Sequence, residues 1–140
     1  MPGMDAASGL ADLRRAGGLT PKLLYAVDAR LTRSSPVANI ARLTSLTAAA
    51  VAAGHGRVLD TSHVIFPNGA ITLVLILAES HLSIHTWPEE NLIAIDLFSC
   101  GAIDGEAVIS GLTRSLRLEA VSVRRLSRGP RPEAGGGQPG

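Results

Sequence analysis

The sequence predicts an α+β fold in which a largely antiparallel sheet and its helices form a two-layer sandwich, with the helices on one face. Three observations support this fold class. Six segments have the β-favouring composition of strands, two stretches have the apolar spacing of helices, and most successive strands are separated only by short turns. Short turns join antiparallel strands, whereas parallel strands need long crossover connections. The predicted order of elements is β-α-β-β-β-β-α-β.

The first strand and the first helix are predicted within residues 23–54. Residues 23–30 form the strand. Ser35 and Pro36 indicate the start of the helix, because a hydroxyl can cap free N–H groups and proline needs no N–H at the first helical position. Gly54 is a natural stop. The apolar stripe of this helix consists of Val37, Ile40, Leu43 and Val51.

Five more strands and a second helix complete the predicted domain. The strands are residues 57–65, 71–77, 82–87, 92–98 and 120–126. Residues 71–77 are a continuous β-favouring run, which is typical of a central strand. Turns at residues 67–69 and 88–91 join neighbouring strands. Asp104 can cap the second helix, which is predicted to run to about Leu118.

We expect one folded domain with a loose segment at each end. The chain has 140 residues, of which 46% are hydrophobic and 18% charged, and these values suit a single packed core. The folded domain is predicted to span residues 20–128. Residues 1–19 are expected to form a flexible arm, and the Gly/Pro-rich residues 129–140 a disordered tail. A domain this small leaves apolar surface poorly covered, which favours a homo-oligomer.

Composition and charge argue against several classes of protein. A net charge of +1 with 3% aromatic residues does not indicate nucleic-acid binding. The longest apolar run, residues 70–78, is too short for a membrane-spanning helix, and the first residues lack the apolar core of a signal peptide. Cys100 is the only cysteine, which suits a reducing compartment. We therefore expect a cytoplasmic protein with no membrane or nucleic-acid partner.

Residues 79–89 carry polar groups that core packing alone does not require. Two histidines, two serines and a carboxylate lie at the start of a predicted strand, beside a buried run. A metal site there would use His81 and His85, which face the same way, completed by Cys100 or His63. Strand geometry, however, separates the two histidines by roughly 13 Å, which is too far for one ion. We therefore predict no metal.

Two other interpretations remain open from residue chemistry alone. Ser80 and His85 could be the nucleophile and the base of a hydrolase, although no Gly-x-Ser-x-Gly elbow surrounds the serine. Alternatively, both could be hydrogen-bonded residues at the polar end of a strand, with no chemical role. Strand alternation does not direct His85 towards Ser80, so joint chemistry would need the chain to bend near residues 80–82.

The same segment closely resembles a known processing signature. Its sequence Glu-Ser-His-Leu-Ser-Ile-His-Thr-Trp-Pro-Glu, at residues 79–89, is similar to the processing site of bacterial and archaeal S-adenosylmethionine decarboxylases. The resemblance continues through residues 94–101, Ala-Ile-Asp-Leu-Phe-Ser-Cys-Gly, and the order of elements agrees across most of the predicted domain. It implies a proenzyme that cleaves itself between Glu79 and Ser80.

The resemblance assigns a chemical role to five residues. Ser80 would attack the carbonyl of Glu79, turning the amide into an ester, and β-elimination would leave a covalent pyruvoyl group in place of the serine. His85 would take the α-proton, assisted by Thr72. The pyruvoyl group would form a Schiff base with the substrate amine, and Cys100 would return a proton after carbon dioxide leaves.

The resemblance also implies the substrate and a pairing of chains. The substrate is S-adenosylmethionine, and the product is its decarboxylated form, the aminopropyl donor of spermidine biosynthesis. Phe66, Trp87 and Tyr25 are candidate aromatic contacts for the adenine and the sulfonium cation, although Tyr25 suits a core position equally well. Glu89 matches an acidic substrate-binding residue. Small family members pair with the active site at or near the interface, so we expect a homodimer of cleaved chains.

Two departures from the family pattern leave alternatives open. Thr20-Pro21-Lys22 stands where relatives have Gly-x-His, and Phe66 directly precedes Pro67, where relatives have one residue between them. Relatives of this fold also decarboxylate arginine or ornithine, and such a substrate would need Asp28 or Asp60 for its distal cation. The chain could also be a non-catalytic partner subunit of an active paralogue, but the intact set of processing residues argues against this.

Overall fold

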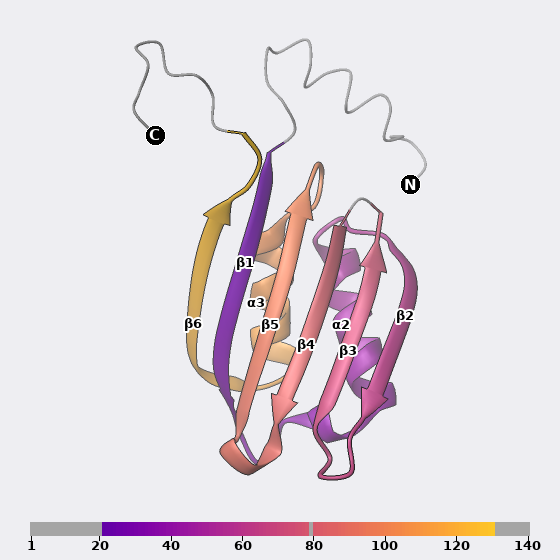
Figure 1. Cartoon of the computed structure of the whole chain (residues 1–140), viewed down its shortest axis with the longest axis vertical. Helices are drawn as coiled ribbons and strands as arrows, with labels where there is room; N and C mark the ends of the chain where they lie inside the picture. The colour runs from indigo at the N-terminus through magenta and orange to yellow at the C-terminus, as the bar shows by residue number, and fades with distance from the viewer. Residues whose placement is uncertain (1–20, 79, 131–140) are drawn as a thin grey trace.

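A computed structural model describes residues 21–78 and 80–130. These residues form one antiparallel sheet with the strand order β2-β3-β4-β5-β1-β6 (Figure 1). The strands are β1 (Lys22–Leu31), β2 (Val58–Ile65), β3 (Ile71–Leu77), β4 (Ser80–Trp87), β5 (Leu92–Cys100) and β6 (Leu118–Ser127). The helices are η1 (Pro36–Ala38), α2 (Ile40–Ala53), η2 (Pro88–Glu90) and α3 (Gly105–Ser115). The predicted α+β class and its antiparallel sheet are confirmed.

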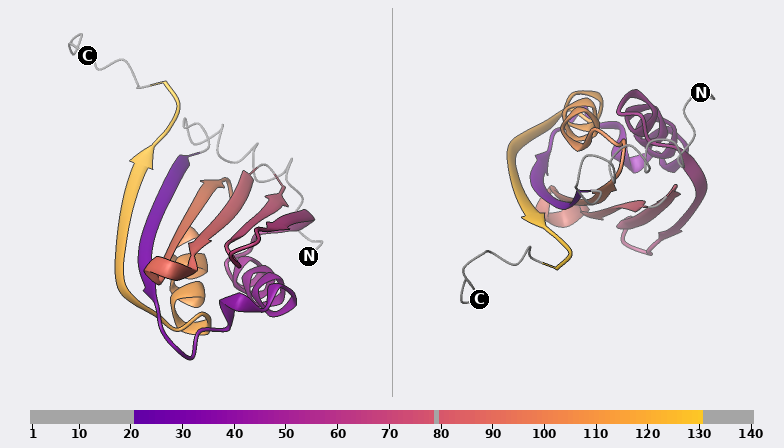
Figure 2. Two further views of the ribbon diagram at one scale, coloured as in Figure 1. Left: turned by 60° about the horizontal axis from the view of Figure 1, so that its bottom comes forward. Right: turned by 90° about the horizontal axis from the view of Figure 1, so that it is seen from above.

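Both α-helices lie on one face of the sheet, which gives two layers (Figure 2). Side chains alternate along each strand. One face of the sheet, here called the helix face, therefore carries buried residues such as Leu73 on β3, Ile84 on β4 and Leu97 on β5. They form a single core with Leu43 of α2 and Leu112 of α3. This burial determines which side chains remain on the opposite face.

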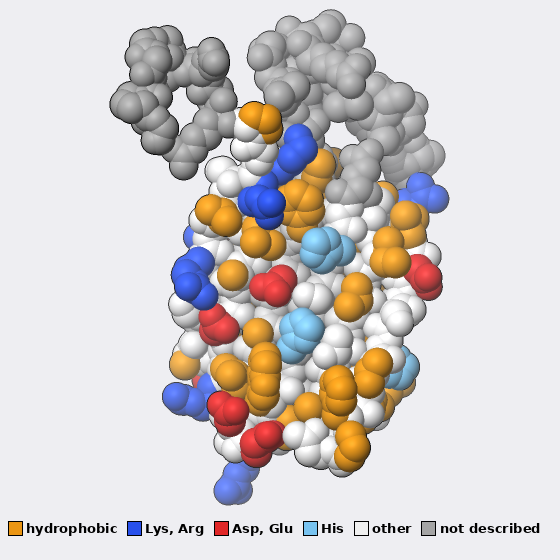
Figure 3. Space-filling model, viewed as in Figure 1, with side chains coloured by type: hydrophobic (Ala, Val, Ile, Leu, Met, Phe, Trp, Pro, Cys, Tyr) orange, Lys and Arg blue, Asp and Glu red, His pale blue; other side chains and the backbone are white. Residues whose placement is uncertain are grey.

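The opposite face of the sheet, here called the open face, is covered by no helix among the described residues (Figure 1). It carries the alternate residues of the central strands, which include Thr72, His81, Ser83, His85, Asp96 and Phe98. Several large apolar side chains are exposed on it, namely Val64, Phe66, Ile76, Trp87 and Leu126. Figure 3 shows that apolar side chains on this face are interleaved with histidines and charged side chains. Such a surface is typical of an interaction site.

The α-helix of the first half starts later than predicted. Its N-cap is Asn39, whose side-chain oxygen accepts a hydrogen bond from the backbone N–H of Arg42 at 3.0 Å. Ser35 and Pro36 begin the short helix η1 instead, and the Ser35 side chain makes no capping hydrogen bond. The extended backbone of Asn39, with φ −95° and ψ 106°, separates the two helices. Gly54 ends α2 as predicted.

The bounds of α3 and β4 also differ from the prediction. Asp104 caps α3 as expected, but the helix ends at Ser115 because Arg117 adopts a left-handed φ of 55° and turns the chain into β6. β4 begins at Ser80, two residues earlier than predicted, because Ser80 already pairs with Leu77 of β3. The first candidate residue of the site therefore belongs to a regular strand.

Two predictions concern the ends of the chain. The predicted arm, residues 1–19, and all but the first two residues of the predicted tail lie outside the described residues. No helix in the described part of the chain is long and apolar enough to cross a membrane.

Candidate active site

β4 carries most of the candidate residues and divides them between the two faces of the sheet. Ser80 shares the helix face with the buried Leu82, whereas His81 and His85 lie on the open face. The alternation follows from strand geometry, in which successive side chains point to opposite sides. Glu79 lies outside the described residues.

The hydroxyl of Ser80 is buried and has no hydrogen-bond partner among the described residues. Leaving a buried hydroxyl unpaired costs about 1–3 kcal/mol. Most buried polar side chains in native proteins are hydrogen-bonded. The hydroxyls of Ser35 and Ser115 are also unpaired among the described residues, so it is the segment 79–89 around Ser80 that distinguishes this serine. An oxygen not committed to a hydrogen bond keeps its lone pairs for attack on a neighbouring carbonyl. This observation fits the role of nucleophile predicted for Ser80.

His85 and Thr72 form a polar pair on the open face. They are directly opposite each other in the β3–β4 ladder, and the hydroxyl of Thr72 lies 3.2 Å from Nδ1 of His85. When Nδ1–H donates to this hydroxyl, Nε2 keeps its lone pair and can accept a proton. The structure thus joins two residues that the sequence separates by 13 positions.

Ser80 and His85 of one chain do not come together. They are five residues apart on β4, which corresponds to about 17 Å of strand, and their side chains lie on opposite faces. The expected bend near residues 80–82 is absent: the pairing of β4 with β3 continues without a shift from Ser80 to His85. Hydrogen bonding to neighbours on both sides keeps the strand straight.

Cys100 lies at the same end of the sheet as Ser80. It is the last residue of β5, it is half-buried, and its thiol is free. β5 pairs with β4 through Phe98 and His81, whose rings are 5.9 Å apart on the open face. Because alternation also places Cys100 on the open face, the thiol and the Ser80 side chain flank the same strand ends from opposite sides.

A groove at the far end of the open face collects the predicted substrate-binding aromatics. It lies over β3, β4 and the β2–β3 turn, and its lining comprises Phe66, Asn68, Ala70, Ile71, Thr72, His85, Thr86 and Trp87. Phe66 and Trp87 are 46% and 38% exposed, so both rings are accessible. Aromatic faces of this kind can hold a planar base or a sulfonium cation. Four predicted residues are therefore brought together around one hollow.

Glu89 lies at the edge of this groove and contacts a residue that the sequence analysis missed. The amide of Asn68 lies 3.4 Å from a carboxylate oxygen of Glu89. Asn68 belongs to the β2–β3 turn, and its side-chain oxygen also accepts a hydrogen bond from the backbone N–H of Ala70 at 3.0 Å. The sequence marked Asn68 only as a turn residue, because 21 positions separate it from Glu89.

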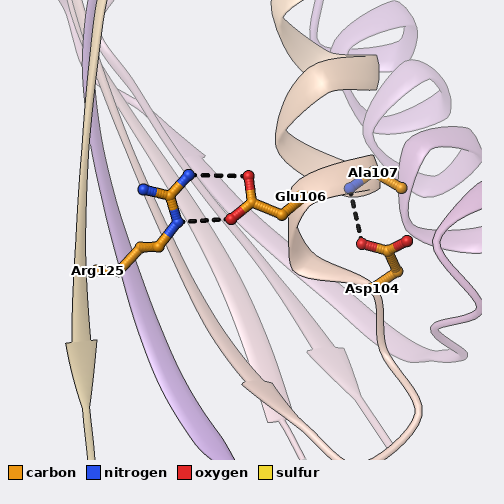
Figure 4. A network of polar contacts seen from close by, with 4 residues as sticks. All are labelled: Asp104, Glu106, Ala107 and Arg125. Carbon is orange, nitrogen blue, oxygen red and sulfur yellow. Dashed lines mark hydrogen bonds and ion pairs between the residues drawn. The ribbon is translucent and has the colours of Figure 1, made fainter.

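Tyr25 occupies the core, which was one of the two positions considered for it. Its ring lies on the helix face, 4% exposed, against the first turn of α3. Gly105 makes this contact possible, since a Cβ there would overlap the ring. The guanidinium of Arg125 on β6 lies 5.7 Å from the ring centre and forms two hydrogen bonds with the carboxylate of Glu106 (Figure 4).

These three side chains shift one another's ionisation. Burial raises the pKa of the Tyr25 phenol, and the nearby Glu106 carboxylate raises it further. The hydrogen bond from Arg125 lowers the pKa of Glu106, and the same bond raises the pKa of Arg125. The cluster ties the edge strand β6 to α3 on the helix face, away from the groove.

The carboxylates considered for an amino-acid substrate lie elsewhere. Asp28 forms an ion pair with Arg124 at 3.4 Å, and Asp60 accepts a hydrogen bond from the backbone N–H of Thr61 on the edge strand β2. Neither carboxylate lines the groove of Phe66 and Trp87. Among the described residues, no three His, Cys, Asp or Glu side chains lie close enough to share a metal ion.

Comparison with known proteins supports one family. Residues 24–129 match the family model described as S-adenosylmethionine decarboxylase. The chain is 39% identical over 85 residues to an S-adenosylmethionine decarboxylase proenzyme 2 of Bacillus cereus, covering 60% of this chain and 68% of that protein. It is 35% identical over 108 residues to an S-adenosylmethionine decarboxylase proenzyme of Picrophilus torridus, covering 76% of this chain and 78% of that protein.

The fold is also similar to a solved structure. The crystal structure of an adenosylmethionine decarboxylase from Aquifex aeolicus superposes with a TM-score of 0.67 and 24% sequence identity, covering 82% of this chain and 96% of that chain. This likeness shows the fold alone. The family is shown by the family model and by the curated relatives, which match in sequence. The chain belongs to the S-adenosylmethionine decarboxylase family.

Proposed function

We propose that the chain cleaves itself between Glu79 and Ser80 and then decarboxylates S-adenosylmethionine, supplying the aminopropyl donor of spermidine biosynthesis. The observation that carries the proposal is the buried, unpaired hydroxyl of Ser80 within a segment that resembles the family's processing site. Membership of the family supports the substrate. The pyruvoyl group fits this position, because it is formed from the serine itself and needs no separate binding pocket.

Self-cleavage begins with the Ser80 hydroxyl. Its oxygen bonds to the carbonyl carbon of Glu79, the bond from that carbon to the Ser80 nitrogen breaks, and the hydroxyl proton ends on this nitrogen. A base then removes the α-proton, and the bond between Cβ and Oγ breaks, which frees Glu79 as a carboxylate. Water finally replaces the nitrogen at position 80 as ammonia leaves, and this exchange completes the pyruvoyl group.

His85, Thr72 and Cys100 move the protons. The Nε2 atom of His85 accepts the α-proton, while Thr72 fixes the ring through Nδ1. When formed, the pyruvoyl group supplies a carbonyl that condenses with the substrate amine and withdraws electrons from the carbon that loses carbon dioxide. The thiol of Cys100 lies at the same end of the sheet as residue 80 and supplies the proton that takes the place of the lost carbon dioxide.

We further propose that two copies pair through their open faces, running in opposite directions. The groove and His85 lie about 17 Å along β4 from Ser80 within one chain, so each copy holds two half-sites at opposite ends of the sheet. Opposed pairing would bring the groove of one copy to the end of the sheet that holds residue 80 and Cys100 in the other. The exposed apolar residues of the open face would be buried by the same contact.

The charges at the two ends of the open face suit this direction of pairing. Lys22 and Arg128 lie side by side at the end that holds Cys100, where the backbone N–H of Arg128 donates a hydrogen bond to the backbone carbonyl of Lys22 at 2.9 Å. Glu89 and Glu90 lie at the other end, in η2, where Arg30 of β1 is also present. In an opposed pair Lys22 and Arg128 of each copy face Glu89 and Glu90 of its partner, whereas pairing in the same direction would bring these like charges together.

An intact mass spectrum of the purified protein tests self-cleavage, with Ser80→Ala as the control. We expect two chains, residues 1–79 and 80–140, of which the second has no free amino terminus, while the control remains whole. Carbon dioxide release is then measured from S-adenosylmethionine, arginine and ornithine in parallel, and only the first should support turnover. A chain that stays uncut after long incubation would contradict the proposal and favour a non-catalytic partner subunit.

A further inference from the structure

Ser80 has a second serine beside it on the helix face. β4 and β5 pair with His81 opposite Phe98, and the same register, continued by one residue, sets Ser80 opposite Ser99. Directly opposite residues of an antiparallel pair share a face, with Cβ atoms about 4.5–5.5 Å apart. Ser99 is 7% exposed, so both hydroxyls are sheltered from water. Hydroxyl side chains that lie directly opposite each other on one face of a sheet can form a hydrogen bond.

The hydrogen bonding of Ser99 leaves it able to accept. Its hydroxyl donates to the carbonyl oxygen of Ile103 at 3.4 Å, in the turn that leads from β5 to α3. A serine oxygen has two lone pairs in addition to its O–H donor. While Ser99 donates to Ile103, its lone pairs remain available to the neighbouring Ser80, whose hydroxyl has no partner among the described residues. The available lone pairs of Ser99 therefore match the unpaired O–H donor of Ser80.

We propose that Ser99 is a positioning residue for self-cleavage, which accepts a hydrogen bond from the Ser80 hydroxyl and fixes the rotamer that attacks. The inference rests on the self-cleavage proposed above and adds a residue to it. The hydrogen bonds then run from Ser80 to Ser99 and on to the carbonyl of Ile103. Fixing one rotamer of a nucleophile removes orientational freedom that the reaction would otherwise lose in its transition state.

Ser99 acts only on the first step of the reaction. In that step the Ser80 oxygen bonds to the carbonyl carbon of Glu79, the carbon–nitrogen bond breaks, and the hydroxyl proton passes to the Ser80 nitrogen. Ser99 neither gains nor loses a proton. The α-proton is removed later by His85, which lies on the open face with Thr72. Loss of Ser99 should therefore slow formation of the ester, whereas loss of Thr72 should slow its breakdown.

The test compares Ser99→Thr with Ser99→Val, which have nearly the same shape but differ in the hydroxyl. Time courses of intact mass follow the fraction of chain cut into 1–79 and 80–140. We expect Ser99→Thr to cleave within about 3-fold of the wild-type rate and Ser99→Val to cleave at least about 10-fold more slowly. Thermal unfolding of both variants in the Ser80→Ala background checks that their folds are equally stable.

Hydroxylamine identifies the affected step, because it cleaves an ester and leaves an amide intact. Brief treatment should cut little of the uncleaved Ser99→Val chain, since its ester does not accumulate. Equal cleavage rates for the two variants would overturn the inference, and so would a large hydroxylamine-sensitive fraction in Ser99→Val. If Ser99→Val does not fold, Ser99→Ala replaces it in the same comparison. Failure of the wild-type chain to cleave would instead contradict self-cleavage itself.

Discussion

At the scale of single residues, the two faces of β4 separate the residues proposed as nucleophile and as base. Ser80 lies on the helix face, where burial leaves its hydroxyl without a partner among the described residues. His85 lies on the open face, where Thr72 holds its ring from the neighbouring strand. The proposed nucleophile therefore has its neighbours on the helix side, whereas the proposed base has its partner on the open side. Alternation of side chains along one strand produces both environments.

The contact between Thr72 and His85 predicts how replacing the Thr72 hydroxyl with a methyl group changes the rate of self-cleavage. Thr72→Val keeps the shape of the side chain but removes the hydrogen bond to Nδ1, so the imidazole loses the partner that orients it. We expect cleavage to slow by about 10-fold or more, with a hydroxylamine-sensitive ester accumulating. Thr72→Ser, which keeps the hydroxyl, should remain within a few-fold of wild type. Intact mass with and without hydroxylamine measures both effects, and equal rates for the two variants would contradict a role for the hydroxyl.

At the scale of elements, the contact between β6 and α3 secures an edge of the sheet. β6 is the last strand in the order and pairs only with β1. Its Arg125 reaches across Tyr25 to Glu106 in the first turn of α3 (Figure 4). A carboxylate near a helix N-terminus also interacts favourably with the helix dipole. One carboxylate thus stabilises both the helix start and the edge strand.

The lowered pKa of Glu106 predicts a pH-dependent contribution to stability. A carboxyl group whose pKa falls on folding stabilises the fold at pH values above its ordinary pKa of 4.5. This stabilisation is lost as the pH falls through the lowered pKa of the folded state. In the uncut Ser80→Ala background, we expect Glu106→Gln to lower the Tm by about 2–4 °C at neutral pH. The difference from the parent should shrink as the pH is lowered below about 4.

Glu119→Gln serves as the matched control for this experiment. Glu119 is an exposed carboxylate on β6, the strand that carries Arg125, and it makes no ion pair with a described residue. Its replacement should leave the Tm within about 1 °C at every pH. Differential scanning calorimetry provides the measurement. A Glu106→Gln deficit that stays constant from neutral to acidic pH would show that the ion pair with Arg125 is not its cause.

At the scale of the whole molecule, one sheet presents two half-sites at its opposite ends. The helices cover one face, and the described residues leave the other face uncovered, with apolar groups and opposite charges distributed along it (Figure 3). Ser80 and Cys100 lie at one end, and the groove with His85 lies at the other. The proposed reaction of Ser80 with His85 therefore requires a second chain, and the proposed opposed pairing would create two such sites for each pair.

Mixing two inactive variants tests this pairing. Ser80→Ala lacks the nucleophile but keeps His85, and His85→Ala lacks the base but keeps Ser80. We expect neither to cleave alone, whereas co-expression should allow the His85→Ala chain to be cut with the help of its partner. Up to about half of that chain should be cleaved, because random association places about half of it in mixed pairs. Mass spectrometry distinguishes the two chains, and no cleavage in mixtures that do form dimers would contradict a shared site.

The sequence determined the number and order of the strands and α-helices, because apolar spacing and turn residues are local signals, but it did not predict the short helices η1 and η2. It also marked Ser80, His85 and Cys100, since their pattern resembles a contiguous family signature. The start of α2 was misplaced because Ser35-Pro36 fits both a short helix and a long one. The bend expected near residues 80–82 does not occur, because backbone pairing with β3 holds β4 straight.

Only the tertiary structure decided which of these residues are neighbours. Strand pairing joined Thr72 to His85, the β2–β3 turn brought Asn68 to Glu89, and the β4–β5 register, continued by one residue, sets Ser99 opposite Ser80. None of these contacts follows from sequence spacing, because each depends on how separate strands pair. Packing of the helices against one face then determined which side chains remain on the other. The physical reason is that a strand specifies its own two faces, whereas burial and pairing with other strands specify what each face meets.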